Sequence, residues 1–119
     1  MRVLFVDDDR INALLFEETC RLAGGIDVMC AGTGAEALEL AAEQRPEVLV
    51  IDLHLPDTRG DALLKALRAA GLQAVPAYLY TADDPRDVDA LARDAGFQGC
   101  WSKPVALDRL LADLAKIPR

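Results

Sequence analysis

The sequence is poor in positive charge and in histidine. Its 119 residues include 13 Lys and Arg against 20 Asp and Glu, so the net charge of −7 leaves no basic surface for direct binding of nucleic acid. One histidine and three widely spaced cysteines, Cys20, Cys30 and Cys100, form no CxxC pair and no zinc-ligand pattern. Free thiols in a reducing cytosol explain these cysteines better than a disulfide framework or a zinc site.

Signals for membrane insertion and export are also lacking. No apolar run approaches the roughly 18 residues that a transmembrane helix requires. The apolar start from Met1 to Val6 is too short for a signal peptide, because acidic residues follow at once. We therefore expect a domain without membrane contact that works in the cytoplasm, either alone or as the cytoplasmic part of a longer protein.

The sequence does contain a series of short apolar runs. Val48 to Ile51 are four consecutive branched residues, three of them β-branched, which is typical of a strand buried on both faces of a parallel sheet. This run leads directly into Asp52. Similar runs predict strands at residues 2–6, 26–31, 75–80 and 98–102.

Capping residues and apolar spacing predict a helix after each strand. Asp9 and Thr33 stand at N-cap positions, Thr33 with Glu36 in the spacing of a capping box, and Asp84 precedes a proline that opens another helix. Five strands alternating with five helices on short connections predict a single α/β domain over residues 1–119 with a mostly parallel sheet. Helical spacing is visible in the first helix (Ile11, Leu14, Leu15, Leu22), the second (Leu38, Ala41, Ala42), the fourth (Val88, Leu91, Ala92, Ala95) and the last (Leu107, Leu110, Leu111, Leu114), and the third covers residues 61–70.

Polar residues stand at the carboxyl ends of four predicted strands. They are Asp7 and Asp8 after the first strand, Asp52 at the third, Thr81 at the fourth and Lys103 at the fifth. Because the carboxyl ends of parallel strands share one edge of the sheet, we expect these side chains to gather where ligands bind in open α/β folds. Three carboxylates about 4 Å apart repel by roughly 4 kcal/mol per pair at an effective dielectric constant of 20. A divalent cation relieves that repulsion, and oxygen ligands favour Mg²⁺, with Mn²⁺ as an alternative.

The same residues predict phosphoryl-transfer chemistry. A lysine beside a metal-bound carboxylate neutralises a phosphoryl group and the charge of its transition state. Asp52 would be the nucleophile that becomes an aspartyl phosphate. Lys103 would neutralise charge, and Thr81 would donate its hydroxyl to a phosphoryl oxygen.

Along its whole length the chain resembles the receiver domain of two-component response regulators. The matching residues are the acidic pair Asp7-Asp8, Asp52 with its loop to Gly60, Thr81-Ala82 and Lys103-Pro104. The resemblance implies a flavodoxin-like (βα)5 fold, a three-layer sandwich whose parallel sheet has the strand order 2-1-3-4-5. It also implies a phosphorelay receiver, rather than an enzyme with a separate substrate, that catalyses its own phosphorylation and dephosphorylation at Asp52.

The resemblance extends to ligands and partners. It implies that Asp8, Asp52 and the backbone carbonyl of His54 hold Mg²⁺, that Asp7 acts through water, and that the Lys103–Pro104 bond is cis. The phosphoryl donor would be a phosphohistidine of a histidine kinase or phosphotransfer protein. The output would be a changed contact with a downstream protein or with another domain of the same chain. The domain would be a monomer or a weak homodimer through the face of helix four, strand five and helix five.

One departure from the family concerns its conformational switch. The family usually has Tyr or Phe three residues before the lysine, a ring that moves as the threonine hydroxyl turns toward the phosphoryl group. Cys100 stands at that position, followed by Trp101. Because a thiol cannot make the same movement, we expect the switch through Thr81, Cys100 and Trp101 either to be weakened or to use Trp101 and Tyr80 instead.

Other functions remain open at this stage. A hydrolase of the haloacid-dehalogenase type would use Asp7 of the DxD at residues 7–9, although Ile11 stands where that family has threonine. A degenerate receiver would serve only as a docking surface, against which the complete acidic, threonine and lysine set argues. A receiver could stand alone or belong to a hybrid sensor kinase, and Asn12 with the run Cys100 to Pro104 favours the second.

Overall fold

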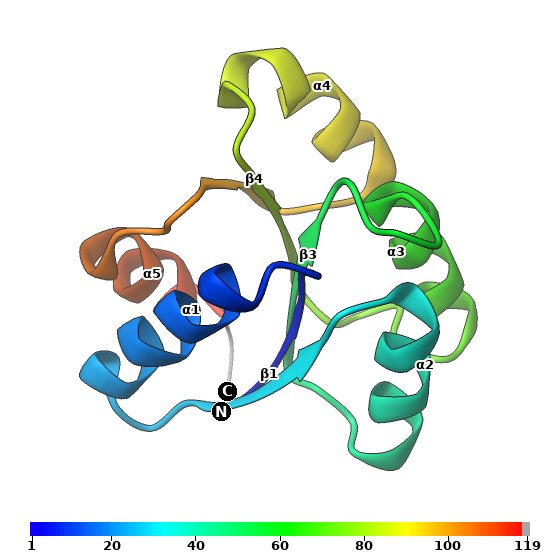
Figure 1. Cartoon of the computed structure of the whole chain (residues 1–119). Helices are drawn as coiled ribbons and strands as arrows, with labels where there is room; N and C mark the ends of the chain where they lie inside the picture. Colours follow the sequence, from blue (N-terminus) through cyan, green and yellow to red (C-terminus); the bar gives the residue numbers. More distant parts are fainter. Residues whose placement is uncertain (118–119) are drawn as a thin grey trace.

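A computed structural model describes residues 1–117 (Figure 1). Within this range five strands and five helices alternate, as predicted, and no helix combines the length and apolar character needed to cross a bilayer. The strands are β1 Arg2–Val6, β2 Asp27–Ala31, β3 Val48–Asp52, β4 Ala77–Thr81 and β5 Gly99–Ser102; the helices are α1 Arg10–Ala23, α2 Gly34–Glu43, α3 Gly60–Ala69, α4 Pro85–Ala95 and α5 Leu107–Leu114.

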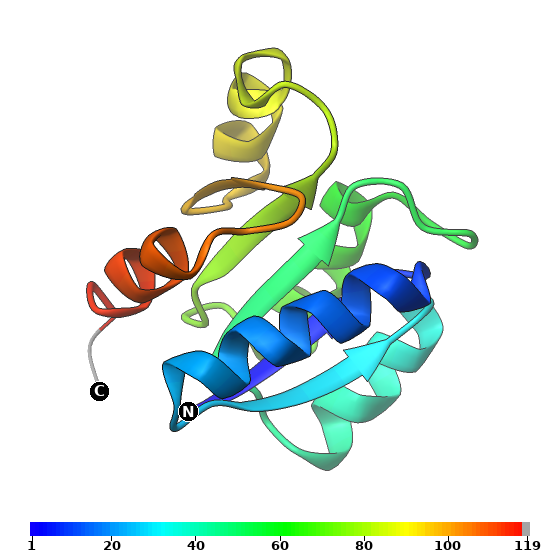
Figure 2. The same cartoon turned by 60° about the vertical axis from the view of Figure 1, so that its left-hand side comes forward.

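The strands form one parallel sheet in the order β2-β1-β3-β4-β5. Helices α1 and α5 cover one face, and α2 and α3 cover the other (Figure 1). In the turned view the arrowheads of β2, β3 and β4 point toward the same edge of the sheet (Figure 2). The flavodoxin-like three-layer sandwich expected from the sequence is therefore confirmed.

The register of the sheet aligns the strand ends. Asp52 at the end of β3 is paired with Tyr80 of β4, and Thr81 is paired with Ser102 of β5. On the other side of β3, Val6 is paired with Ile51. The residues that follow or end these strands therefore meet at one edge.

Side-chain caps fix the start of three helices. The caps predicted at Asp9, Thr33 and Asp84 are confirmed, since each side chain accepts a hydrogen bond from a backbone N–H of the first turn. The capping box differs in one bond, because Glu36 accepts from the N–H of Gly32 at 3.1 Å. The start of β4 also differs from prediction: Val75 lies in a turn, with its N–H directed to the carbonyl of Leu72 at 3.3 Å, and the strand begins at Ala77.

The two faces of the sheet carry chemically different cores. Under α2, α3 and α4 the buried side chains are mostly aliphatic, and we call them the aliphatic layer. Under α1 and α5 they include most of the rings of the molecule, and we call them the aromatic layer. The aliphatic layer includes Leu49, Ile51, Leu64, Leu67 and Cys100; the aromatic layer includes Phe5, Phe16, Tyr78, Tyr80 and Trp101.

Helix α1 turns its longest apolar stripe outward. A stripe at helical spacing ordinarily packs against the core. Here Ile11 is 68% exposed, whereas Phe16 and Cys20 on the opposite face are buried. The aromatic face packs inward because Phe16 stacks on Phe5 of β1, with ring centroids 4.3 Å apart. The exposed stripe, called the α1 row, consists of Ile11, Leu14, Leu15 and Leu22.

Helix α5 divides its predicted apolar residues between core and surface. Leu110 and Leu114 are buried in the aromatic layer, whereas Leu107 and Leu111 are partly exposed, at 36% and 46%. The spacing therefore predicts the helix, but only alternate members of the stripe reach the core.

Candidate functional site

The carboxyl edge of the sheet brings most of the predicted site residues together. Asp7 and Asp52 are buried carboxylates, and Lys103 reaches both of them. Its Nζ lies 2.9 Å from Asp7 Oδ2 and 3.0 Å from Asp52 Oδ2, with only 13% of the lysine side chain exposed. One ammonium group therefore bridges two carboxylates that the sequence places 45 residues apart.

Asp7 is oriented by further donors. Its Oδ1 accepts from the N–H of Asp9 at 2.9 Å, and its Oδ2 accepts from Asn12 Nδ2 at 3.2 Å. Asp9 also caps α1, so the start of this helix is built around the Asp7 carboxylate. In the sequence Asn12 serves only to favour a hybrid sensor kinase, whereas the structure places its side-chain amide against Asp7 in the site.

Three carboxylates form a cluster suited to a cation. Ligand oxygens of Asp7, Asp8 and Asp52 lie within 4.8 Å of one another, with Asp8 exposed and the other two buried. The donors are all oxygen atoms, which hard divalent cations prefer. Lys103 neutralises two of the three carboxylates and leaves the solvent side of the cluster to Asp8. The residues present therefore fit a divalent ion such as Mg²⁺.

The ionisation of the site follows from burial and from the bridge. Burial raises the pKa of Asp52, and the hydrogen bond from Lys103 opposes that rise. Burial alone would lower the pKa of Lys103, but its hydrogen bonds to Asp7 and Asp52 outweigh burial and raise the pKa. Lys103 is therefore a fixed positive charge at neutral pH.

The loop between β3 and α3 packs closely on Asp52. The N–H of His54 is directed to Asp52 Oδ1 at 3.4 Å. A Cβ added at Gly60 would lie 2.3 Å from the carbonyl oxygen of Asp52, so only glycine fits there. The His54 imidazole is exposed, and its Nε2 lies 3.8 Å from Asp83 Oδ2.

Thr81 ends β4, and its hydroxyl oxygen accepts one hydrogen bond. It is 1% exposed, and its Oγ1 accepts from the N–H of Asp83 at 3.0 Å. A hydroxyl that accepts one hydrogen bond still has its own proton to donate.

Strand β5 sends its two switch candidates to opposite faces. Cys100 belongs to the aliphatic layer, and Trp101 to the aromatic layer. The indole Nε1 of Trp101 donates to Asp113 Oδ2 of α5 at 2.6 Å, and its ring stacks on Tyr78 at 4.5 Å between centroids. The Lys103–Pro104 bond that follows is cis, as expected.

The carboxylates of Asp113 and Asp57 form hydrogen bonds that were not predicted from the sequence. Asp113 is 6% exposed and also accepts from Arg109 Nε at 2.8 Å. The spacing of Arg109 and Asp113 by four residues was the available signal for that pair. Asp57, in the loop between β3 and α3, accepts hydrogen bonds from the start of α2, and no local sequence pattern marks that contact.

Comparisons with known proteins point to one family. A family model described as response regulator receiver domain matches residues 3–115. Response regulator MprA of Mycobacterium leprae is 36% identical over 119 residues, which are 100% of this chain and 51% of that protein. Sensory/regulatory protein RpfC of Xanthomonas campestris pv. campestris is 30% identical over 120 residues, covering 98% of this chain and 16% of that protein.

A solved structure supports the same assignment. The chemotaxis response regulator CheY4 of Vibrio cholerae matches with a TM-score of 0.85 at 27% identity, covering 98% of each chain. The chain thus spans about half the length of MprA and a smaller part of RpfC. Since the family model covers nearly every residue between β1 and α5, the chain belongs to the response regulator receiver domains, the phosphoacceptor modules of two-component signalling.

Proposed function

We propose that Asp52 accepts a phosphoryl group from a phosphohistidine of a histidine kinase or phosphotransfer protein. The observation that carries the proposal is the Lys103 bridge, which places a buried ammonium against the carboxylate of Asp52. An ammonium at this position faces the charge that develops on a transferring phosphoryl group. In the proposed role, the domain catalyses its own phosphorylation and later dephosphorylation.

The transfer is a substitution at phosphorus. A carboxylate oxygen of Asp52 attacks the phosphorus atom, the P–N bond to the donor histidine breaks, and its electron pair returns to the imidazole nitrogen. Lys103 pairs with a phosphoryl oxygen, and Thr81 donates its hydroxyl proton to another. The product is an acyl phosphate, from which water later removes the phosphoryl group.

The acidic cluster supports a metal in this reaction. Asp7, Asp8 and Asp52, with the backbone carbonyl of His54, would hold Mg²⁺ or Mn²⁺. When bound, the ion supplies positive charge opposite the phosphoryl oxygens. Asp7 is already oriented by hydrogen bonds from the N–H of Asp9 and from Asn12 Nδ2.

The α1 row supports docking of the phosphoryl donor beside the site. Ile11 follows the Asp9 cap by two residues, and Asp9 in turn is bonded to Asp7. Contiguous exposed apolar residues commonly mark interaction surfaces. We expect the protein that carries the donor phosphohistidine to pack on the site end of this row.

The output side involves α4, β5 and α5. Phosphorylation would change contacts of this face with a downstream protein or a domain of the same polypeptide, in a monomer or a weak homodimer. Relatives include a response regulator, of which the chain spans about half, and a sensory/regulatory protein, of which it spans a smaller part, so a longer response regulator and a hybrid sensor kinase are both consistent with the chain. In either setting we expect the domain to act in the cytoplasm.

A mass measurement tests the proposal. The protein is incubated with Mg²⁺ and acetyl phosphate or phosphoramidate, and the adduct is located by peptide mass spectrometry. We expect one phosphoryl adduct on Asp52 that is absent from Asp52→Asn. Lack of an adduct on the wild-type protein would overturn the proposal, and an adduct on Asp7 would support the hydrolase alternative.

A further inference from the structure

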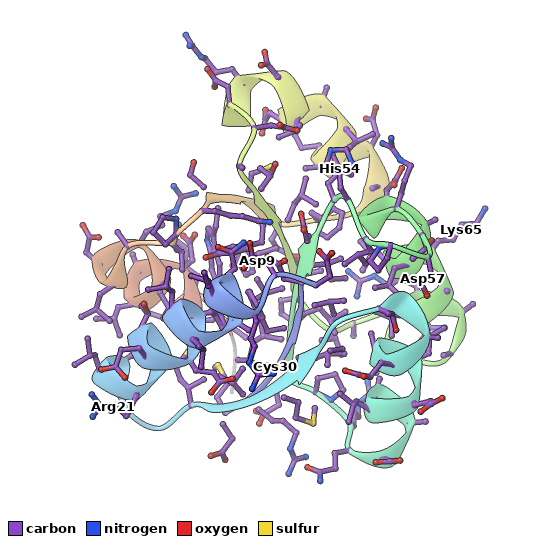
Figure 3. The ribbon with its side chains drawn as sticks, in the orientation of Figure 1. Asp9, Arg21, Cys30, His54, Asp57 and Lys65 are labelled. Carbon is purple, nitrogen blue, oxygen red and sulfur yellow. The ribbon has the colours of Figure 1, made fainter. Side chains whose placement is uncertain are left out.

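We propose that Asp57 is a positioning residue that ties the β3–α3 loop to the start of α2 and thereby holds the His54 backbone beside Asp52. This inference rests on the proposed function of the site. The loop covers residues 53–59, and Asp57 lies at the end farthest from the sheet, next to α2 (Figure 3). Its contacts join a segment of the site to a helix that otherwise contributes no residue to it.

The carboxylate of Asp57 binds two successive backbone groups. Oδ1 accepts from the N–H of Gly34 at 2.9 Å, and Oδ2 accepts from the N–H of Ala35 at 3.1 Å. These donors belong to the first turn of α2, where the helix dipole favours a negative charge. The two hydrogen bonds lower the pKa of Asp57, as expected for a carboxylate held at a helix start.

Helix α2 has its own N-cap, so Asp57 is a second and independent attachment. Thr33 Oγ1 accepts from the N–H of Glu36 at 3.1 Å, a group that Asp57 does not contact. The Thr33 bond lies entirely within the start of α2. The Asp57 bonds instead cross 23 and 22 residues of sequence.

The loop and α2 also fit together sterically. A Cβ added at Gly34 would lie 2.6 Å from Thr58 Cγ2 and 3.5 Å from the Asp57 carboxylate oxygens. The absence of a side chain at Gly34 therefore lets the loop approach the helix backbone closely enough for the hydrogen bonds of Asp57.

Within the loop, backbone hydrogen bonds connect Asp57 to the site. The N–H of Leu55 donates to the carbonyl of Thr58 at 3.2 Å, and the N–H of Gly60 donates to Leu53 at 2.8 Å. A bridge also pairs His54 with Arg59. These bonds leave the loop few ways to bend between its tip and its base. A loop fixed at the tip by Asp57 therefore holds the His54 N–H toward Asp52 Oδ1.

A purely structural role for Asp57 makes a different prediction. If Asp57 served only to stabilise α2, removing the separate cap by Thr33→Ala would reproduce the effect of Asp57→Ala. If Asp57 acted only through its charge, Asp61→Asn would reproduce it, since Asp61 is another carboxylate near the loop, paired with Arg59. These two variants are the matched controls.

The experiment measures the metal-free protein, Mg²⁺ binding and phosphorylation separately. Amide resonances of wild type, Asp57→Ala, Asp57→Asn, Thr33→Ala and Asp61→Asn are recorded without metal, then during a titration with Mg²⁺ alone. Phosphorylation by phosphoramidate is then timed at saturating Mg²⁺. All five proteins are compared under conditions where their amide spectra show them folded.

We expect the His54 amide to shift in metal-free Asp57→Ala and to stay in place in both controls. Loss of an outer contact that orients a ligand typically weakens metal binding or activity by 10-fold or more, and we expect about 10-fold weaker Mg²⁺ binding in Asp57→Ala. Asp57→Asn keeps one acceptor oxygen and should fall between alanine and wild type. The controls should stay within about 2-fold of wild type, as expected for positions outside the ligand shell.

Two outcomes would overturn the inference. One is a His54 amide and Mg²⁺ affinity unchanged in Asp57→Ala. The other is an equal loss in Thr33→Ala or Asp61→Asn. If the wild type itself took no phosphoryl group while the amide shifts and Mg²⁺ affinities followed the expected order, the proposed function would fail and the positioning role would stand.

Discussion

The two faces of the sheet differ in the kind of side chain they bury. The aliphatic layer under α2, α3 and α4 is built mainly from Leu, Val, Ile and Ala, and Phe97 is its ring among the described residues. The aromatic layer under α1 and α5 contains rings that touch one another from β1 to β5. Phe5 stacks on Phe16 and meets Tyr80 edge-on at 5.2 Å, while Trp101 stacks on Tyr78.

Of the two layers, the aromatic layer contacts the bridging lysine of the site through Tyr80. Lys103 Nζ lies 5.5 Å from the Tyr80 ring centroid, and the Tyr80 hydroxyl accepts from the N–H of Val105 at 3.4 Å. The aromatic layer therefore reaches from the bridging lysine toward the loop before α5. The buried side chains that define the aliphatic layer are apolar, so its main contribution is apolar burial. We expect mutations in the aliphatic layer to change stability, and mutations in the aromatic layer to change the β5–α5 junction as well.

The largest effect on stability is expected from Leu64→Ala in the aliphatic layer. Leu64 is fully buried, and truncation of such a leucine costs about 3 kcal/mol of unfolding free energy. Urea unfolding should show this loss, while phosphorylation of the folded fraction stays unchanged. Leu111→Ala, on the exposed side of α5, is the control, and a loss from it as large as from Leu64→Ala would contradict the assignment of Leu64 to the core.

Trp101→Phe is expected to have the next largest effect. It keeps a ring against Tyr78 but removes the hydrogen bond to the buried Asp113 carboxylate, and hydrogen bonds to charged groups contribute about 2 kcal/mol. Urea unfolding measures the loss. The double variant Trp101→Phe with Asp113→Asn should lose less than the two single losses added together. Simple additivity would show that the two side chains do not act as a pair.

The buried Asp113 carboxylate should make the stability of the aromatic layer depend on pH. Burial raises the pKa of this carboxyl, but hydrogen bonds from Trp101 and Arg109 outweigh burial and leave the pKa below its usual value. A carboxyl with a lowered pKa stabilises the fold above its unfolded value of about 3.9, and this contribution is lost as the pH falls through the folded pKa. Below about pH 4 the wild type should therefore lose stability more steeply than Asp113→Asn. Parallel curves from thermal unfolding at several pH values would argue against this contribution.

Cys100→Tyr is expected to change stability less than the preceding variants, and to change mainly how far a phosphoryl mimic at Asp52 shifts the amides of α4. Cys100 sits where the aliphatic layer meets α4 and is only 8% exposed. We expect a phosphoryl mimic at Asp52 to shift amides near Thr81 in the wild type, with only small shifts in α4. Cys100→Tyr should extend the shifts across α4, and full-sized α4 shifts in the wild type would show that no ring is required.

Ile11→Glu, on the exposed face of α1, is expected to have the smallest effect on stability. Exposed substitutions usually change unfolding free energy by less than about 0.5 kcal/mol. Transfer from an ATP-phosphorylated histidine kinase should slow, whereas phosphorylation by acetyl phosphate should not. Leu22→Glu changes the same α1 row at its other end, and equal slowing by both variants would contradict docking at the site end.

Much of this structure was predictable because short-range signals agree with the fold. Each strand is a short apolar run, and Asp9, Thr33 and Asp84 cap helices as their positions indicated. The site was predictable because parallel strands bring their carboxyl ends to one edge, which joins Asp52 to Lys103. These predictions needed no knowledge of which side chains touch across the core.

Long-range contacts were not predictable from the same signals. Helix α1 has two apolar stripes, and periodicity cannot tell the exposed α1 row from the face of Phe16 and Cys20 that packs inward. The choice depends on the stacking of Phe16 with Phe5 of another element. The partners of Asp57 and the burial of Asp113 likewise depend on neighbours that only the folded chain supplies.

The position of Trp101 gives the domain a natural optical probe. It is the single tryptophan of the chain, it is almost fully buried, and its indole lies between the Tyr78 ring and the Asp113 carboxylate. Intrinsic fluorescence excited at the indole therefore originates from one place, the junction of β5 with α5. Stopped-flow emission from unlabelled protein can consequently time a structural change at this junction.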